Sequence, residues 1–210
     1  MPSAPFFIVG SARSGTTMLR LMLNAHPEVA VPPESRFIVE LWHGDSQVDA
    51  AEYLKELAAH KRFQAWDLPI EAVAMELGDG RVPFVSAIEA TFRAWARAAG
   101  RERWGDKTPR YIEHIPFLAE LFGDAKFIHL IRDGRNVALS YADVPFGPKS
   151  IGAAAQLWAE RVSMGMRDGR PLGGDRYFEL RYEDLVDDAE GEIKDTCAFL
   201  ELDFDPGMLD

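Results

Sequence analysis

Apolar residues follow two alternating spacings along the chain. Short apolar runs that suit strands of a buried parallel sheet occupy residues 6–9, 29–31, 126–131 and 177–180, and a further short strand is expected at 103–107. Apolar residues at helical spacing occupy residues 18–23, 50–62, 69–77, 83–99, 110–122, 136–143, 151–166 and 189–200. This alternation predicts an α/β fold with a central, mainly parallel sheet.

Residues 44–99 carry helical spacing and no run that suits a buried strand. We therefore expect a helical insertion at about 44–100, inside a single domain that spans residues 1–210. The aromatic residues of this insertion, such as Phe84, Phe92 and Trp95, are most simply core residues. The insertion would also suit one wall of a substrate pocket.

The turn between the first strand and the first helix has the spacing of a phosphate-binding loop, Gly10-x-x-x-x-Gly15-Thr16-Thr17. Backbone N–H groups and the helix N-terminus would supply positive potential there, and Arg13 adds a permanent charge. Thr16 stands where nucleotide triphosphatases have lysine, so a nucleoside triphosphate with magnesium fits less well. A glycine-rich turn without a ligand is the alternative, but strand, loop, arginine and helix together favour an anion site.

The predicted strand at 126–131 also leads into a turn that contains glycine and arginine, as the first strand does. Arg132 follows the predicted strand 126–131 directly and precedes the helix at 136–143. Ser140 lies eight residues later, about two turns, so the two side chains would share a face of one helix. This predicts a second anion site; an arginine that caps neighbouring structure is the alternative.

Two further charged residues follow predicted strands. Glu34 comes after Val29–Val31 and the stiff pair Pro32-Pro33, and Lys107 ends the strand at 103–107. Both should therefore lie at the carboxyl edge of the sheet, where open α/β sheets bind ligands.

The composition of the chain limits which classes of molecule it would bind and in which cellular compartment it would lie. The formal net charge is -11, and 11 of the 34 acidic residues lie between 183 and 210, where Lys194 is the one basic residue. This argues against nucleic acid as a partner and suggests a solvated acidic helix face. No apolar run reaches membrane-spanning length, and residues 1–4 lack the basic region of a secretory signal.

Cysteine and histidine content limit the chemistry further. Cys197 is the single cysteine, so no intrachain disulfide forms, and we expect a buried, inert thiol and a cytoplasmic protein. The five histidines show no metal-ligand spacing, so no metal site is predicted.

Several motifs together resemble the sulfotransferases that use 3′-phosphoadenosine 5′-phosphosulfate (PAPS). The resemblance is greatest to the R-S-G-T-T branch, which includes tyrosylprotein sulfotransferases and many bacterial sulfotransferases. It covers residues 6–204, in the family's order. Its motifs are Gly10-Ser11-Ala12-Arg13-Ser14-Gly15-Thr16-Thr17, Ala25-His26-Pro27, Glu34-Ser35-Arg36, Asp106-Lys107, Ile131-Arg132-Asp133-Gly134-Arg135 with Ser140, and Arg181-Tyr182-Glu183-Asp184-Leu185.

The resemblance implies a P-loop-like three-layer α/β/α fold and a role for each motif. Arg13, Ser14, Gly15, Thr16 and Thr17 would bind the 5′-phosphosulfate. Arg132 and Ser140 would bind the 3′-phosphate, and Tyr182 would lie near the nucleotide. Glu34 would be the catalytic base, while Lys107 and Arg13 would stabilise the leaving group. The reaction would pass a sulfuryl group to an acceptor hydroxyl and release 3′-phosphoadenosine 5′-phosphate (PAP), without a metal.

Two departures from the family's pattern affect expected cofactor affinity. The family continues past the last helix with a basic, glycine-containing loop that closes over the nucleotide, whereas this chain ends at Asp210. Some relatives have an arginine four residues after the Ser140 position, where this chain has Val144.

Two other functions remain open on the sequence: a P-loop nucleotide kinase, and a non-catalytic nucleotide-binding relative. The acceptor is also open among a small-molecule alcohol or phenol, a glycan and a peptide tyrosine. A metabolite or glycan suits the predicted cytoplasmic setting without a membrane partner. The oligomeric state is undetermined, a homodimer included.

Overall fold

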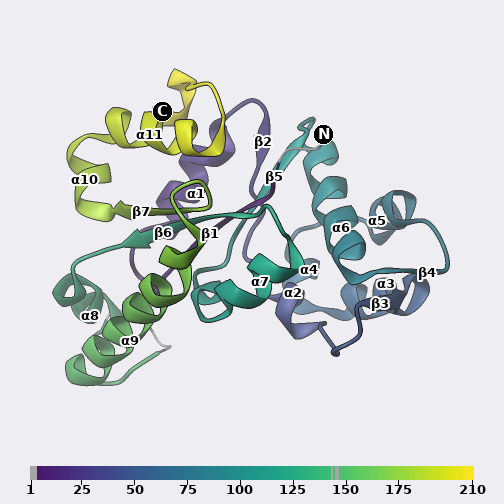
Figure 1. Cartoon of the computed structure of the whole chain (residues 1–210), viewed down its shortest axis with the longest axis horizontal. Helices are drawn as coiled ribbons and strands as arrows, with labels where there is room; N and C mark the ends of the chain where they lie inside the picture. The colour runs from purple at the N-terminus through teal and green to yellow at the C-terminus, as the bar shows by residue number, and fades with distance from the viewer. Residues whose placement is uncertain (1–3, 143, 145–146) are drawn as a thin grey trace.

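Five parallel strands form the central sheet of the computed structural model, which describes residues 4–142, 144 and 147–210 (Figure 1). Their order across the sheet is β2-β5-β1-β6-β7. Their bounds are Phe6–Gly10 (β1), Val29–Ala30 (β2), Arg103–Lys107 (β5), Lys126–Ile131 (β6) and Tyr177–Arg181 (β7). Each neighbouring pair is parallel, which confirms the predicted sheet.

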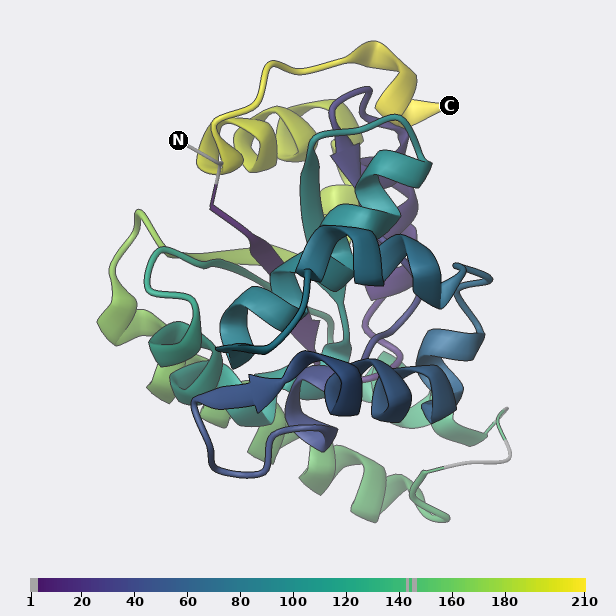
Figure 2. The same ribbon diagram turned by 90° about the vertical axis from the view of Figure 1, so that its right-hand side faces the viewer.

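Helices connect the strands and cover both faces of the sheet (Figures 1 and 2). The α-helices are α1 (Thr16–Ala25), α2 (Phe37–Glu40), α3 (Ala50–Ala59), α4 (Lys61–Gln64), α5 (Ile70–Leu77), α6 (Phe84–Ala98), α7 (Ile115–Leu121), α8 (Gly134–Ala142), α9 (Ile151–Gly169), α10 (Tyr182–Asp187) and α11 (Ala189–Leu200). Short 3-10 helices occupy Pro109–His114, Arg170–Leu172 and Pro206–Leu209. None of the helices described is long and apolar enough to cross a membrane.

Side-chain alternation along β1 divides the core into two clusters. Phe6 and Ile8 point to the face that is covered by α1, α10 and α11. Phe7 and Val9 point to the other face, where they join the apolar residues of α6 and α7. Cys197 lies buried in the first cluster, and burial raises the pKa of its thiol to about 11, as expected for an inert cysteine.

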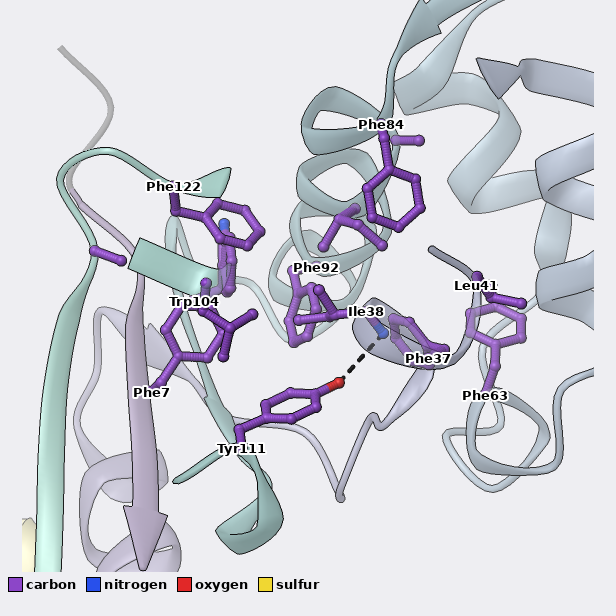
Figure 3. Packing of buried hydrophobic residues seen from close by; sticks show 14 of the residues in the cluster. Phe7, Phe37, Ile38, Leu41, Phe63, Phe84, Phe92, Trp104, Tyr111 and Phe122 are labelled. Atoms are coloured by element: carbon purple, nitrogen blue, oxygen red, sulfur yellow. Dashed lines mark hydrogen bonds between the residues drawn. The ribbon is translucent and has the colours of Figure 1, made fainter. Parts of the chain in front are cut away.

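Aromatic side chains join the insertion (residues 44–100) to the sheet. Phe92 of α6 stacks on Trp104 of β5 with ring centroids 4.3 Å apart, and it also contacts Phe37 (Figure 3). Trp104 in turn makes an edge contact with Phe7. The insertion therefore shares its core with the sheet, which confirms that these aromatics are core residues.

The insertion differs from the predicted run of helices in two places. The predicted helix 50–62 is wrong, because His60 is extended and separates α3 from α4; its ring accepts from the Arg62 N–H and contacts Glu40. Strands β3 (Gln47–Asp49) and β4 (Arg81–Pro83) pair antiparallel as a short ribbon that the apolar spacing did not predict.

Three helix boundaries outside the insertion also differ from prediction. The segment 110–122 is a 3-10 helix followed by α7, because Pro116 cannot donate a helical hydrogen bond and clashes with the preceding turn. Helix α8 begins at Gly134, two residues early, and the predicted end at Asp143 lies outside the described residues. Helix α10 was not predicted.

The last helix offers a test of local stability. Asp188 is the N-cap of α11, and its carboxylate accepts from the Gly191 N–H at 3.0 Å. We expect Asp188→Ala to cost about 1 kcal/mol in the free energy of unfolding, measured by denaturant titration. Asp188→Asn keeps the acceptor without the charge and should cost a few tenths at most; an equal loss in both variants would contradict a capping role.

Candidate active site

The loop between β1 and α1 (residues 10–17, the anion loop) has a backbone suited to an anion. Arg13 and Gly15 adopt left-handed conformations, with φ of 73° and 92°. A Cβ on Gly15 would lie 2.3 Å from the ring of Tyr182, so only glycine fits there. The first N–H groups of α1 have no intrahelical acceptor, and no acidic residue lies in its first turn.

A buried hydroxyl in the anion loop has no hydrogen-bond partner among the described residues. The Ser14 side chain is fully buried, yet its Oγ contacts no donor or acceptor there. Buried polar atoms are normally paired, so an unpaired hydroxyl in this loop fits a missing anionic ligand. Thr16 is buried and Thr17 is exposed at the start of α1.

The predicted second anion site lies directly beside the anion loop. Arg13 Nε donates to Ser140 Oγ at 3.0 Å, and Arg132 donates from Nη1 to the backbone oxygen of Arg13 at 3.1 Å. The Arg132 guanidinium lies over the Tyr182 ring, 4.4 Å from its centroid. Arg132 Nε is buried without an acceptor in the described part of the chain. Four predicted nucleotide-binding residues therefore meet.

The expectation that Arg132 and Ser140 share one helix is wrong, because Arg132 precedes α8. They come together because both contact Arg13. Two further residues fix the turn that holds Arg132: Trp158 of α9 donates to its backbone oxygen at 3.0 Å, and Glu183 accepts from the Asp133 N–H at 2.9 Å.

Glu34 and Lys107 form an ion pair at the carboxyl edge of the sheet. Lys107 Nζ lies 3.2 Å from Glu34 Oε1 and 3.4 Å from Thr17 Oγ1, so it links the carboxylate to the start of α1. Glu34 Oε2 also lies 3.9 Å from Arg36 and 3.8 Å from Arg62. The Lys107 side chain is 7% exposed and that of Glu34 is 26% exposed, so the carboxylate is the more accessible of the pair.

Beneath this pair lies a buried polar cluster to which the sequence analysis gave no role, although Ser35 and Asp106 stand in its motifs. Asp106 is fully buried and accepts from the hydroxyls of Ser35 and Thr108. Burial raises the pKa of Asp106 to about 7, although both hydroxyls oppose the rise. Ser35 follows Glu34 and Asp106 precedes Lys107, so this adjacency was the available signal. Arg62 was also missed, because it lies in the insertion and no motif marks it.

The described residues hold no group of three or more histidine, cysteine, aspartate or glutamate side chains placed to bind a metal ion. The candidate site consists of two parts that meet at the start of α1. One part comprises Arg13, Arg132, Ser140 and Tyr182; the other comprises Glu34, Lys107 and Thr17.

A sequence profile described as "Sulfotransferase family" matches residues 5–206. The chain belongs to the sulfotransferase family. It is 30% identical to nodulation protein NoeE of Sinorhizobium fredii, over 94% of the chain and 50% of that protein. It is 26% identical to a protein-tyrosine sulfotransferase of Drosophila melanogaster, over 97% of the chain and 39% of that protein. The chain thus spans half or less of the length of these two relatives.

Solved structures show that the chain has the family's fold. The sulfotransferase domain of the Synechococcus olefin synthase superposes with a TM-score of 0.70 at 27% identity, over 99% of the chain and 76% of that domain. A mouse sulfotransferase crystallised with PAP superposes with a TM-score of 0.56 at 16% identity, over 98% of the chain and 61% of that protein. The P-loop-like α/β architecture is therefore confirmed.

Proposed function

We propose that this sulfotransferase transfers a sulfuryl group from PAPS to an acceptor hydroxyl. One observation carries the proposal. Arg13 of the anion loop contacts both residues of the second anion site, Arg132 and Ser140, and the Glu34–Lys107 pair lies beside them. PAPS carries a phosphosulfate and a separate 3′-phosphate, which matches two adjacent anion sites. The buried, unpaired Ser14 Oγ and Arg132 Nε fit such a ligand, because both lack partners among the described residues.

In this proposal each side chain has a defined task. The anion loop binds the 5′-phosphosulfate, while Arg132 and Ser140 bind the 3′-phosphate and Tyr182 stacks beneath Arg132. Glu34 accepts the proton of the acceptor hydroxyl as the new O–S bond forms. The S–O bond to the phosphate breaks in line, and its electron pair goes to the phosphate oxygen of PAP. Lys107 and Arg13 stabilise that developing charge.

The competing kinase proposal makes a different prediction about ligands. Thr16 occupies the position of the phosphate-binding lysine, and Arg132 with Ser140 offers a second anion site that ATP does not need. A thermal-shift comparison separates the two functions. We expect PAP to raise the melting temperature more than ATP with magnesium; stabilisation by ATP alone would rule out the sulfotransferase proposal.

Gly15 provides a test of the anion loop that does not depend on turnover. We expect Gly15→Ala to lower PAP affinity by at least about tenfold in calorimetry, because the new Cβ forces either the Tyr182 ring or the loop to move. Gly100→Ala is the matched control: Gly100 also has positive φ, at +70°, but nothing lies within 4 Å of its added Cβ. Equal affinities in the two variants would contradict the assignment of the loop.

The surroundings of Glu34 indicate the kind of acceptor. Arg36 and Arg62 lie near its carboxylate, and both line a cavity of about 600 Å³ together with Glu40, Ala59, His60, Lys61 and Ala65. Cations outnumber carboxylates on this side, which favours an acceptor with an anionic group near its hydroxyl. We expect kcat/KM to be about fivefold higher for a phenol carrying a carboxylate than for its neutral amide. Equal rates would contradict this preference.

A further inference from the structure

The buried cluster beneath Glu34 and Lys107 has a consistent direction of hydrogen bonding. The Ile38 N–H donates to the Tyr111 hydroxyl at 3.2 Å, as Figure 3 shows, and Tyr111 lies 3.0 Å from Ser35 Oγ. Ser35 Oγ donates to Asp106 Oδ2 at 2.5 Å. A second path runs from the Ser35 N–H to Thr108 Oγ1 at 3.1 Å, and from Thr108 to Asp106 Oδ1 at 2.7 Å.

This direction identifies Asp106 as the common acceptor. Tyr111 accepts from a backbone N–H, so its own proton goes to Ser35, and the Ser35 proton then goes to Asp106. With Asp106 as a carboxylate, every hydroxyl in the cluster has an acceptor. The hydroxyls of Ser35 and Thr108 therefore converge on one buried carboxyl group, that of Asp106.

Lys107 ends β5 and pairs with Ile8 of β1, but the pairing of β2 with β5 stops before Glu34, so another contact must hold Glu34 in register. Strands β2 and β5 pair at two positions, Val29–Arg103 and Ala30–Trp104. The chain then leaves the sheet through Pro32-Pro33, and Ser35, two residues after Pro33, joins Thr108 and Asp106. Ser35 is bonded covalently to Glu34, and Asp106 and Thr108 flank Lys107. The cluster therefore joins the segment after β2 to the end of β5, beyond the last β2–β5 pair, at the point where Glu34 meets Lys107.

We propose that Asp106 is a positioning residue, which acts through Ser35 and Thr108 to hold the Glu34 carboxylate against Lys107. We call Ser35, Asp106, Thr108 and Tyr111 the clamp. The proposal rests on the proposed function, in which Glu34 takes the acceptor proton. The clamp makes no contact with the anion-binding residues Arg132 and Ser140 among the bonds described, so its loss should affect turnover and spare the nucleotide.

Ser35→Ala removes one donor to Asp106 with little change in volume. We expect kcat to fall by about 10- to 100-fold, because small displacements of a catalytic group are costly. The PAP dissociation constant should stay within about twofold of wild type. Thr108→Val should have the same effect, and Thr108→Ser, which keeps the hydroxyl, should recover most of the activity.

A buried hydroxyl elsewhere in the chain supplies the matched control. Thr91 Oγ1 lies 2.6 Å from the Tyr53 hydroxyl inside the insertion, and both side chains are buried. Thr91→Ala should destabilise the fold by a similar amount as Ser35→Ala, shown by its melting temperature, but it should retain wild-type kcat. Equal kcat losses in these two variants would mean that reduced stability, not positioning, explains the effect.

A structural measurement tests the clamp without turnover. In crystal structures, the distance from Lys107 Nζ to the Glu34 carboxylate should lengthen beyond hydrogen-bond range in Ser35→Ala and stay near 3.2 Å in the wild type. An unchanged distance, or wild-type kcat in Ser35→Ala, would overturn the clamp while leaving the proposed function in place. Absence of both PAP binding and turnover in the wild type would refute the proposed function, and the distance would still decide whether the clamp positions Glu34.

Discussion

Replacing Glu34 by glutamine is expected to lower turnover by about 10²- to 10⁴-fold, the usual contribution of a positioned general base. The amide has nearly the same shape as the carboxylate but cannot accept the hydroxyl proton. PAP affinity should stay within about twofold, because Glu34 contacts Lys107, Arg36 and Arg62 and none of the residues proposed to bind the 3′-phosphate. Steady-state kinetics and calorimetry on the same preparation measure the two quantities.

Glu113→Gln is the matched control for that experiment. Glu113 is also a partly exposed carboxylate, at 24%, and it pairs with two arginines, Arg110 and Arg161. It lies outside both parts of the candidate site, so its variant should keep wild-type turnover. Undiminished turnover in Glu34→Gln would remove Glu34 from the role of base; equal losses in both variants would point to a general effect of removing an ion pair.

Replacing Arg132 by alanine is expected to lower PAP affinity by about 10- to 100-fold, which corresponds to the loss of one or two hydrogen bonds to a charged group. The same variant should bind adenosine 5′-phosphosulfate, which lacks the 3′-phosphate, almost as well as wild type does. The preference for PAP over that ligand should therefore disappear. Calorimetric titration of both ligands into both proteins measures the change.

Arg135 provides a control from the same turn. Its guanidinium is paired with Asp133 and its side chain is 89% exposed, whereas Arg132 lies over Tyr182. Arg135→Ala removes the same formal charge and should leave the PAP dissociation constant within about twofold. If the two variants lost affinity equally, general electrostatic attraction would explain binding and a specific 3′-phosphate contact would not.

The sheet was predictable because its signals are local and strong. Strands β1, β2, β6 and β7 carry short apolar runs, and β1 and β6 lead into turns with glycine and arginine that mark the carboxyl edge. The positions of Glu34 and Lys107 at that edge followed from their places at the C-terminal ends of predicted parallel strands. The elements that were missed, such as α10 and the β3–β4 ribbon, are short, and their few residues carry too little periodicity to detect.

The contacts among the site residues were less predictable, because they join segments that lie far apart in the sequence. Arg132 and Ser140 were expected to meet along one helix, yet Arg13 from a distant segment joins them. Arg62 reaches Glu34 only because the chain breaks at His60 and turns α4 toward the site. Such contacts arise from folding of the insertion onto the sheet, which no local pattern encodes. The catalytic and binding roles of these residues stay predictions.

The measurement that tests the central claim most directly is calorimetric binding of PAP, adenosine 5′-phosphosulfate and ATP with magnesium to the wild-type chain. The two adjoining anion sites predict that PAP binds most tightly and that adenosine 5′-phosphosulfate, which lacks the 3′-phosphate, binds at least about tenfold more weakly. Equal binding of PAP and adenosine 5′-phosphosulfate, or a preference for ATP with magnesium, would contradict the account.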